Sequence, residues 1–338
     1  MRPLTPRRIL WICGLLGAVL FGVVVISLRM GAYPISVGDI VMTLFNGVIG
    51  RWDQVQSEFR LVVFGLRLPR IALGILVGAA LSTAGAGFQA LLRNPLADPY
   101  VLGVSSGAAL GAILSLIVAP HTPGAIQAAA FAGAAATIAA VYFLGRRGGQ
   151  LDSATLLLAG IVTASFLSAV IMFLMTTLSG RDLRGMAFWL MGDLTGAPVV
   201  GLKWLYFLML VGVGSIYTTT SDLNLILTGE REAWHLGVNV SRIKLVVYVA
   251  ASLLTGLAVS VSGAIGYVGL LVPHVMRMLF GTDYRLLIPA SAIGGAIAIV
   301  LADTLARTVV APTELPVGAM TALAGAPVFI YLMRRRVR

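Results

Sequence analysis

The residues that could perform chemistry in this chain are few and scattered. Ser105 and Ser106 have no histidine or lysine nearby in the sequence that could act as a base, so no nucleophilic site is predicted. The glycine-rich loop that binds nucleotide phosphates is absent, because Lys203 falls one position late in the nearest approximation and no hydroxyl follows it. We therefore expect no catalytic, cofactor-binding or metal-binding residue, and no ATP hydrolysis by this chain. The cysteine and histidines, too separated to predict a metal site, are Cys13, His121, His235 and His274.

Acidic residues lie near the ends of the apolar segments and in the loops. Ion-coupled transporters usually carry ionisable groups in the middle of the membrane, whereas the middle of each apolar segment here is nearly free of charge. This pattern disfavours an ion-coupled secondary transporter, which stays as an alternative of another class, and favours an energy source outside the chain. The acidic residues are Asp98, Asp152, Asp193, Asp283, Asp303 and Glu314.

The composition indicates a helical membrane protein. Of the 338 residues, 59% are hydrophobic and 11% are charged, whereas soluble domains carry about 25% charged residues. Long continuous apolar runs favour helices over the alternating strands of a barrel. The predicted fold class is all-α, a polytopic membrane helical bundle, with residues 1–338 forming a single transmembrane domain. The net charge of +11 is mostly arginine, which we assign to topology and partner docking rather than to nucleic acid.

Ten apolar segments are predicted to cross the membrane. The eighth is short and contains Pro273. Arginines gather in both tails and at Arg146–Arg147, and an even number of spans then places both termini in the cytoplasm. The first run lacks a small-residue cleavage site, so it is predicted to remain as a helix. The predicted spans are 9–28, 71–91, 101–119, 126–144, 154–178, 203–220, 245–263, 267–281, 286–306 and 316–333, and residues 35–45 could form a short amphipathic helix between the first two.

Residues 93–111 form a polar, proline-containing break followed by a helix with a glycine stripe. Pro95 and Pro99 lack N–H donors and hold the preceding residues extended, so no helix can continue through them. Gly103, Gly107 and Gly111 recur every four residues, which puts them on one helix face where another backbone can approach closely. The stretch suits a gate or the lining of a pathway, and it equally suits an ordinary loop before a packing helix.

Three arginines are predicted at the outer ends of two spans, where positive charge is disfavoured. Arg67 and Arg70 precede the second span, and Arg307 follows the ninth. We therefore expect a negatively charged group to compensate for the positive charge of these arginines. Either they reach lipid phosphates, or they dock an acidic extracytoplasmic partner through bidentate contacts with its carboxylates.

Residues 221–244 are the longest polar segment on the predicted cytoplasmic side. Thr228 is a candidate N-cap for a short helix at about 229–238, and Gly237 can end it. Trp234 and Leu236 are unusually apolar for a surface helix, and exposed apolar groups surrounded by charge indicate a partner surface. The segment would either rest on lipid or fit a groove of a cytoplasmic ATPase. The residues assigned to it are Glu230, Arg231, Trp234, Leu236 and Gly237.

A series of motifs occurs in order along residues 60–333. They are Arg67-Leu-Pro-Arg70, Gln89, Arg93-Asn-Pro-Leu-Ala-Asp-Pro99, Leu102-Gly-Val-Ser-Ser-Gly107, Leu236-Gly-Val-Asn239, Gly266-Tyr-Val-Gly-Leu-Leu-Val-Pro-His274, Ala302-Asp303 with Arg307, and Glu314-Leu-Pro-Val-Gly318. Each motif is weak alone, whereas the ordered set is specific. Together they resemble the permease family of binding-protein-dependent ABC importers (type II importers) for iron siderophores, heme and vitamin B12.

The resemblance implies a ten-helix subunit that pairs with a second copy of itself around a pathway at their interface. It also implies two cytoplasmic subunits that bind ATP and Mg, and a substrate-binding protein outside. Arg67, Arg70 and Arg307 match arginines that meet glutamates of that binding protein, and residues 230–239 match the coupling helix. The residues that match the cytoplasmic gate are Asn94, Pro95, Leu96, Ser153 and Ala154, of which Ala154 departs from the hydroxyl that the family often has.

The sequence therefore predicts the permease subunit of an ATP-driven importer in a bacterial inner membrane. Its cargo would be an iron chelate, heme or a ferric siderophore, moved by alternating access. Vitamin B12 or another corrinoid is the alternative cargo in the same role. A pathway with few charges suits a bulky ligand that a binding protein selects and delivers.

Overall fold

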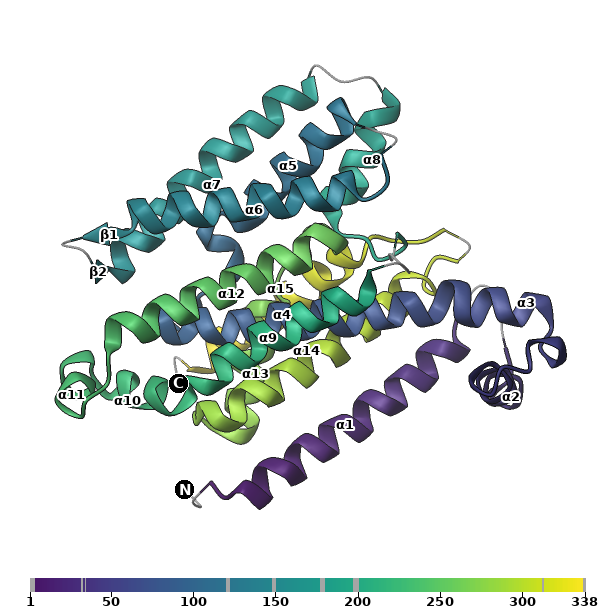
Figure 1. Cartoon of the computed structure of the whole chain (residues 1–338), viewed down its shortest axis with the longest axis horizontal. Helices are drawn as coiled ribbons and strands as arrows, with labels where there is room; N and C mark the ends of the chain where they lie inside the picture. The colour runs from purple at the N-terminus through teal and green to yellow at the C-terminus, as the bar shows by residue number, and fades with distance from the viewer. Residues whose placement is uncertain are drawn as a thin grey trace.

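The computed structural model describes residues 4–31, 33, 35–119, 122–147, 150–176, 180–196, 201–311 and 313–336. Nearly all of them are helical (Figure 1). The helices are α1 (Pro6–Arg29), α2 (Val37–Val48), α3 (Ser57–Arg60), α4 (Leu68–Leu91), α5 (Val104–Val118), α6 (Ala125–Leu144), α7 (Ser153–Thr176), α8 (Gly180–Met191), α9 (Leu202–Thr218), α10 (Thr220–Thr228), α11 (Glu230–His235), α12 (Val240–Ser262), α13 (Val268–Phe280), α14 (Tyr284–Ala306) and α15 (Val317–Arg336). A π-helical stretch, η2 (Leu61–Arg67), two 3-10 turns, η1 (Trp52–Gln54) and η3 (Pro99–Leu102), and a small antiparallel hairpin of β1 (Arg146–Arg147) and β2 (Gln150–Leu151) complete the described elements.

Helix α4 runs through the middle of the bundle, and almost all of its residues are buried (Figure 1). A Cβ atom at Gly78 would lie 2.1 Å from the carbonyl oxygen of Gly295 in α14. One at Gly85 would lie 1.8 Å from the carbonyl oxygen of Gly269 in α13. In lipid the hydrophobic effect does not drive helices together, so they associate through close packing at small residues. These glycines therefore set the positions of α13 and α14 against α4.

The predicted glycine stripe is a contact surface between helices. A Cβ atom at Gly107 would lie 2.0 Å from Thr137 Oγ1, and one at Gly111 would lie 2.1 Å from the carbonyl oxygen of Ala129, both in α6. Gly103 has a φ of 74° and lies against α7 instead. The stripe thus packs α5 between its two neighbours, which is the plainer of the two roles that the spacing allowed.

All ten predicted spans fall on helices, but several of these helices are short. In the described part of the chain, six helices are long and apolar enough to cross a membrane, and α9 with α10 adds a seventh if that pair, bent by 46°, is one span. Helices α5, α13 and α15 are apolar but shorter. The number of ten spans therefore stays a prediction. The end of the fifth predicted span, at residues 177 and 178, lies outside the described residues, as does His121.

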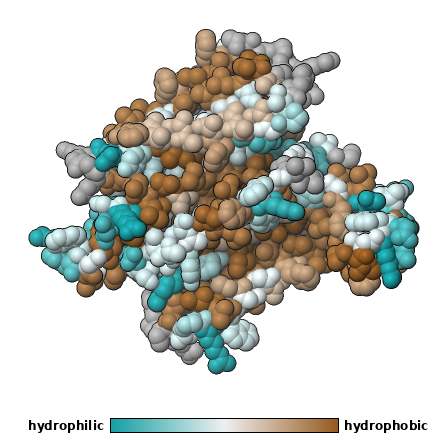
Figure 2. All heavy atoms as spheres, in the orientation of Figure 1, coloured by the Kyte–Doolittle hydropathy of each residue, from teal (hydrophilic) through white to brown (hydrophobic). Residues whose placement is uncertain are grey.

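The surface has the polarity of a multi-pass membrane protein. Figure 2 shows hydrophobic residues over the middle of one face, with hydrophilic residues gathered toward the ends of the long helices. No residue in the most apolar stretch of α1 is fully buried by the rest of the chain, although one side of the helix packs against α14. A helix of this kind suits a lipid environment. Its backbone groups are hydrogen-bonded within the helix, and its exposed apolar side chains can contact lipid instead of water.

Two elements near the start of the chain differ from the predicted boundaries. The expected short helix at 35–45 is present as α2, shifted by a few residues. The helix predicted to begin at residue 71 begins at Ser57, because α3, η2 and α4 form one continuous rod of 35 residues. Apolar residues between Leu61 and Leu66 let the helix continue past the charged positions. Arg67 and Arg70 therefore lie inside this rod rather than before it.

Candidate functional site

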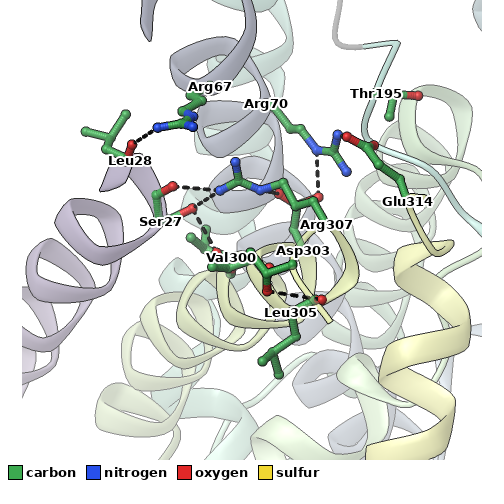
Figure 3. Close-up of polar contacts among 12 residues, drawn as sticks. Ser27, Leu28, Arg67, Arg70, Thr195, Val300, Asp303, Leu305, Arg307 and Glu314 are labelled. Atoms are coloured by element: carbon green, nitrogen blue, oxygen red, sulfur yellow. Dashed lines mark hydrogen bonds and ion pairs between the residues drawn. The ribbon is translucent and has the colours of Figure 1, made fainter. Parts of the chain in front are cut away.

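Three arginines and two carboxylates meet where α4 begins and α14 ends; we call Arg67, Arg70, Asp303, Arg307 and Glu314 the arginine cluster (Figure 3). Arg70 Nε donates to Asp303 Oδ1 at 2.7 Å, and its Nη1 donates to Glu314 Oε2 at 2.7 Å. Asp303 Oδ2 also lies 3.3 Å from Nε of Arg307, one turn further along α14. The carboxylate of Asp303 is thus shared by two guanidinium groups.

The same cluster holds the C-terminal end of α1. Arg67 donates to the carbonyl oxygens of Leu28 and Tyr33 (Figure 3). Arg307 Nη2 donates to both the carbonyl oxygen and the Oγ of Ser27, each at 2.7 Å. The last carbonyls of a helix have no partner within it, so two guanidinium groups supply the missing donors. These contacts anchor the C-terminal end of α1 to the bundle, where Ser27 and Leu28 are buried.

The three predicted docking arginines are buried in this conformation. Their exposed fractions are 5% for Arg67, 9% for Arg70 and 7% for Arg307. In this conformation carboxylates and helix-end carbonyls of the same chain bind them, and their predicted docking role stays a prediction. Asp303 and Glu314 both stand in the sequence motifs; the close contact of α4 with α14 brings Asp303 to Arg70, and the segment before α15 brings Glu314.

The predicted cytoplasmic gate loop follows the opposite end of α4. Asn94 Oδ1 accepts the N–H of Leu96 at 2.9 Å, which closes a tight turn around Pro95. Asn94 and Leu96 are exposed. Arg93, just before them, has a φ of 50°, a left-handed conformation that costs a non-glycine residue about 1–2 kcal/mol. The loop is therefore an exposed turn with a strained residue at its entrance.

The second part of the predicted gate lies beside this loop. Ser153, the first residue of α7, donates its hydroxyl to the carbonyl oxygen of Leu91 at 3.3 Å. Ala154 next to it is exposed and has no hydroxyl to offer. The structure thus brings Ser153 to the end of α4, so the start of α7 and the loop after α4 are joined at one point.

A buried amide joins the loop after α4 to the neighbouring helices; we call this loop, residues 92–98, the gate loop after its predicted role. Gln89 Nε2 donates to the carbonyl oxygen of Leu270 at 3.1 Å and to that of Ala97, in the loop, at 3.5 Å. Its Oε1 accepts from Arg277 Nη2 at 2.9 Å, and that nitrogen also donates to Tyr284 Oη at 3.3 Å. Gln89 stood among the sequence motifs without a role. A glutamine inside an apolar helix was the available signal, because a buried amide needs partners on both of its ends.

The carboxyl group of Asp98 ends the gate loop and is held mostly away from water. Its Oδ1 accepts the N–H of Tyr100 at 2.8 Å. Burial raises the pKa of Asp98 to about 6, and the hydrogen bond from Tyr100 opposes this rise only in part. The folded chain therefore binds this proton more tightly than the unfolded chain does, so the contribution of Asp98 to stability is fully present below about pH 4 and is lost as the pH rises through about 6.

Replacing Asp98 by Asn should remove that pH dependence. Asn keeps the acceptor for Tyr100 and cannot ionise. Because part of the Asp98 side chain remains exposed, the gain at pH 7.5 should be smaller than the ~3 kcal/mol that the pKa shift equals. Thermal unfolding of Asp98→Asn and the wild type in the same detergent at pH 5 and pH 7.5 measures it. A variant that melts at or below the wild-type temperature at pH 7.5 would contradict this account.

The predicted coupling segment exposes apolar side chains next to an ion pair. Glu230 begins α11 and accepts from Lys244 Nζ of α12 at 2.7 Å. The carboxylate of Glu230 also lies 4.0 Å from Arg93 Nη1, at the entrance to the gate loop. Trp234 and Leu236 are 66% and 67% exposed. Glu230 thus connects α11 both to α12 and to the loop after α4.

The boundaries of α11 confirm one predicted cap and correct the other. Gly237 has a φ of 87°, and its N–H donates to the carbonyl oxygen of Trp234 at 2.9 Å, so it follows the helix end as predicted. The N-cap is not Thr228, which is the last residue of α10 and donates its hydroxyl to the carbonyl oxygen of Leu225. Gly229 takes that position, and the helix has six residues rather than ten.

The arrangement described so far agrees with the comparison to known proteins. The sequence matches the profile of the FecCD transport family over residues 13–335. The chain belongs to the FecCD transport family. Members of the FecCD family are permease subunits of ABC importers, in which a separate subunit hydrolyses ATP, and this chain is such a permease subunit.

Individual FecCD-family relatives are similar over most of their length. The chain is 43% identical to the cobalamin import system permease protein BtuC of Halobacterium salinarum, over 83% of this chain and 76% of that one. It is 38% identical to the Fe(3+)-citrate import system permease protein YfmD of Bacillus subtilis, over 92% and 90%. A solved structure of a metal-chelate type ABC transporter in an inward-facing conformation is 30% identical and covers 96% of this chain and 99% of that one, with a TM-score of 0.82.

The polar sites of this FecCD-family chain lie at the two ends of the long helices. The arginine cluster is at one end of α4, and the gate loop is at the other, close to α11 (Figure 1). Within the ranges that the structure describes, no three His, Cys, Asp or Glu side chains are grouped so that they could hold a metal ion. The polar groups thus gather at the two ends of α4, and the buried apolar length of that helix lies between them.

Proposed function

We propose that the chain forms half of a homodimeric permease that imports an iron chelate, heme or a ferric siderophore, by alternating access. The observation that carries the mechanism is the contact of Glu230 with Lys244 and Arg93. A shift of α11, driven by a cytoplasmic ATPase, would move this carboxylate and with it the entrance to the gate loop. ATP can bias the two states only if the ATPase holds α11 differently in each of them.

The surface around α11 has the chemistry of a protein interface. Apolar Trp234 and Leu236 project from a charged surrounding, and exposed groups of this kind mark contact sites. Beside them is a hollow of about 620 Å³ between α11 and the start of α12. Both chain ends and α11 lie toward the same side of the molecule (Figure 1), which supports cytoplasmic termini. The residues that line the hollow include Glu230, Arg231, Trp234, Asn239, Ser241 and Lys244.

The cargo is proposed from the relatives and is open to a direct test. A relative named for Fe(3+)-citrate and a structure named for metal chelates support an iron chelate, while the relative named for cobalamin favours a corrinoid as the second candidate. The permease, reconstituted in liposomes with its ATPase and binding protein, should accumulate heme or a ferric siderophore only with ATP. Accumulation of cyanocobalamin alone would show that the cargo is a corrinoid rather than an iron chelate. Accumulation driven by an ion gradient without the ATPase would contradict the proposal of an ATP-driven importer.

The arginine cluster is the proposed docking site for an acidic extracytoplasmic binding protein. It holds three guanidinium groups against two carboxylates and lies at the end of α4 remote from α11 (Figure 3). Such an excess of positive charge attracts carboxylates and orients them through bidentate contacts. The burial of the three arginines means that docking requires the cluster to open, at least at Glu314, its most exposed member.

Replacing Arg70 by Gln should weaken the docking of the binding protein by about tenfold, since one buried charge-assisted contact is lost. Gln is neutral and leaves Asp303 paired with Arg307, whereas Glu at this position would bring three carboxylates together and disturb folding. The measurement is the dissociation constant of the binding protein on the complex in nanodiscs. The matched control is Arg60→Gln, an exposed arginine that lies over the Trp52 ring. Equal affinity in the wild type and Arg70→Gln would remove the docking role.

A further inference from the structure

The two carboxylates that bind Arg70 are held in different ways. Asp303 lies on α14, its side chain is 2% exposed, and it is shared with Arg307. Glu314 lies on the non-helical segment before α15, its side chain is 47% exposed, and its ion pair is with Arg70 alone among the described residues. Figure 3 shows the guanidinium of Arg70 between these two partners.

This difference decides which pair can exchange. A buried pair is costly to break, because separation leaves an unpaired charge away from water. The pair with Glu314 is easier to separate, because water solvates the half-exposed carboxylate and Arg70 keeps Asp303 as its partner. The contact of Glu314 is therefore the weak point of the arginine cluster, while Asp303 keeps Arg70 in place when Glu314 leaves.

We propose that Glu314 is an internal competitor for docking. It occupies Arg70 Nη1 in the undocked permease and is displaced by a carboxylate of the extracytoplasmic binding protein. The inference rests on the proposed docking function and adds to it a residue that opposes docking. The chemistry on both sides of the exchange is the same, a carboxylate against a guanidinium, so the incoming group needs only better geometry or an additional contact to replace Glu314.

The displacement would also reach α15. The N–H of Leu315, next to Glu314, donates to the carbonyl oxygen of Ala306 at 3.0 Å, and α15 begins two residues later at Val317. A Cβ atom at Gly318 would lie 2.2 Å from the carbonyl oxygen of Met191 at the end of α8, so the first turn of α15 fits closely against that helix. Release of Glu314 therefore loosens the segment that sets the position of α15 against α8 and α14.

The test is Glu314→Gln in the intact complex, with its ATPase, in nanodiscs. The probe is the binding protein that most strongly stimulates ATP hydrolysis by the wild-type complex. Gln has the size of Glu but no charge, so Arg70 is left available, and the dissociation constant should fall by about threefold to fivefold, the range that an exposed ion pair allows. In the Arg70→Gln background the same change should have no effect, because the competed group is absent.

The matched control is Asp53→Asn, which removes one negative charge from an exposed position before α3. Equal tightening in this control would show a general effect of net charge and overturn the competition. Unchanged or weaker docking in Glu314→Gln, with weakened docking in Arg70→Gln, would overturn the competition and leave the docking site intact. Unchanged docking in Arg70→Gln would contradict both the docking site and the competition by Glu314. Failure of Glu314→Gln to assemble would show that Glu314 is a structural brace, which also overturns the proposal.

Discussion

A permease in which Trp234 and Leu236 are both replaced by Asp should no longer co-purify with its ATPase and should lose transport by at least about tenfold. The two side chains are about two-thirds exposed in the free chain. A large aromatic group at the centre of an interface contributes about 2 kcal/mol or more, which corresponds to more than tenfold in affinity. Charges at both positions would also have to be desolvated for the partner to bind.

The matched control for this surface is Leu227→Asp. Leu227 is 37% exposed near the end of α10, directly before α11, so it places the same charge on a neighbouring apolar position. Co-purification is measured by affinity capture of the tagged permease, and transport by uptake into liposomes. If the double variant and Leu227→Asp lose the ATPase alike, the effect belongs to the whole region rather than to α11. If the double variant keeps both ATPase and transport, α11 is not the coupling helix.

Replacing Gly85 by Val should prevent the chain from folding into a stable bundle. The added Cβ atom would lie 1.8 Å from the carbonyl oxygen of Gly269, and backbone on both sides cannot move aside as a side chain could. The helices α4 and α13 would have to separate, which removes packing along their whole contact. Overpacking of this kind costs more than ~3 kcal/mol, a large fraction of the stability of any domain.

The matched control for this packing is Gly14→Val. Gly14 lies in α1, where an added Cβ atom would have nothing within 4 Å. Both variants are scored by the yield of monodisperse protein in detergent and by its melting temperature. The control should behave as the wild type. A Gly85→Val protein that is obtained in normal yield and melts within a few degrees of the wild type would show that α4 and α13 do not pack as described.

Local features of the sequence were enough to predict the helices but not all of their ends. An apolar run specifies a helix by itself, so each of the ten predicted spans coincides with one. The rod from Ser57 to Leu91 begins well before the predicted start at residue 71, because the residues between Arg60 and Arg67 are apolar and let the helix continue. The N-cap of α11 was placed one residue early because Thr228 is a good capping residue, and its hydroxyl is used by α10 instead.

The contacts between sites far apart in the sequence could not be predicted in the same way. The motifs placed Arg67 and Arg70 near Asp303 and Glu314 only as members of one family pattern. The pairing of Arg70 with Asp303 depends on Gly78 and Gly295, which bring α4 and α14 together. Arg70 and Asp303 are 233 residues apart in the chain, and no local sequence pattern indicates that they meet. The ion pair of Glu230 with Lys244 also joins two elements, and neither periodicity nor capping residues indicate it.

The left-handed backbone of Arg93 has a mechanical consequence for the turn that it begins. Holding a non-glycine residue at a φ of 50° costs about 1–2 kcal/mol, and a surface ion pair returns at most about 1 kcal/mol. The side chain of Arg93 makes such a pair with Glu230. The ion pair therefore offsets only part of the strain, and the proposed movement of α11 away from Arg93 would leave that strain without its partial compensation.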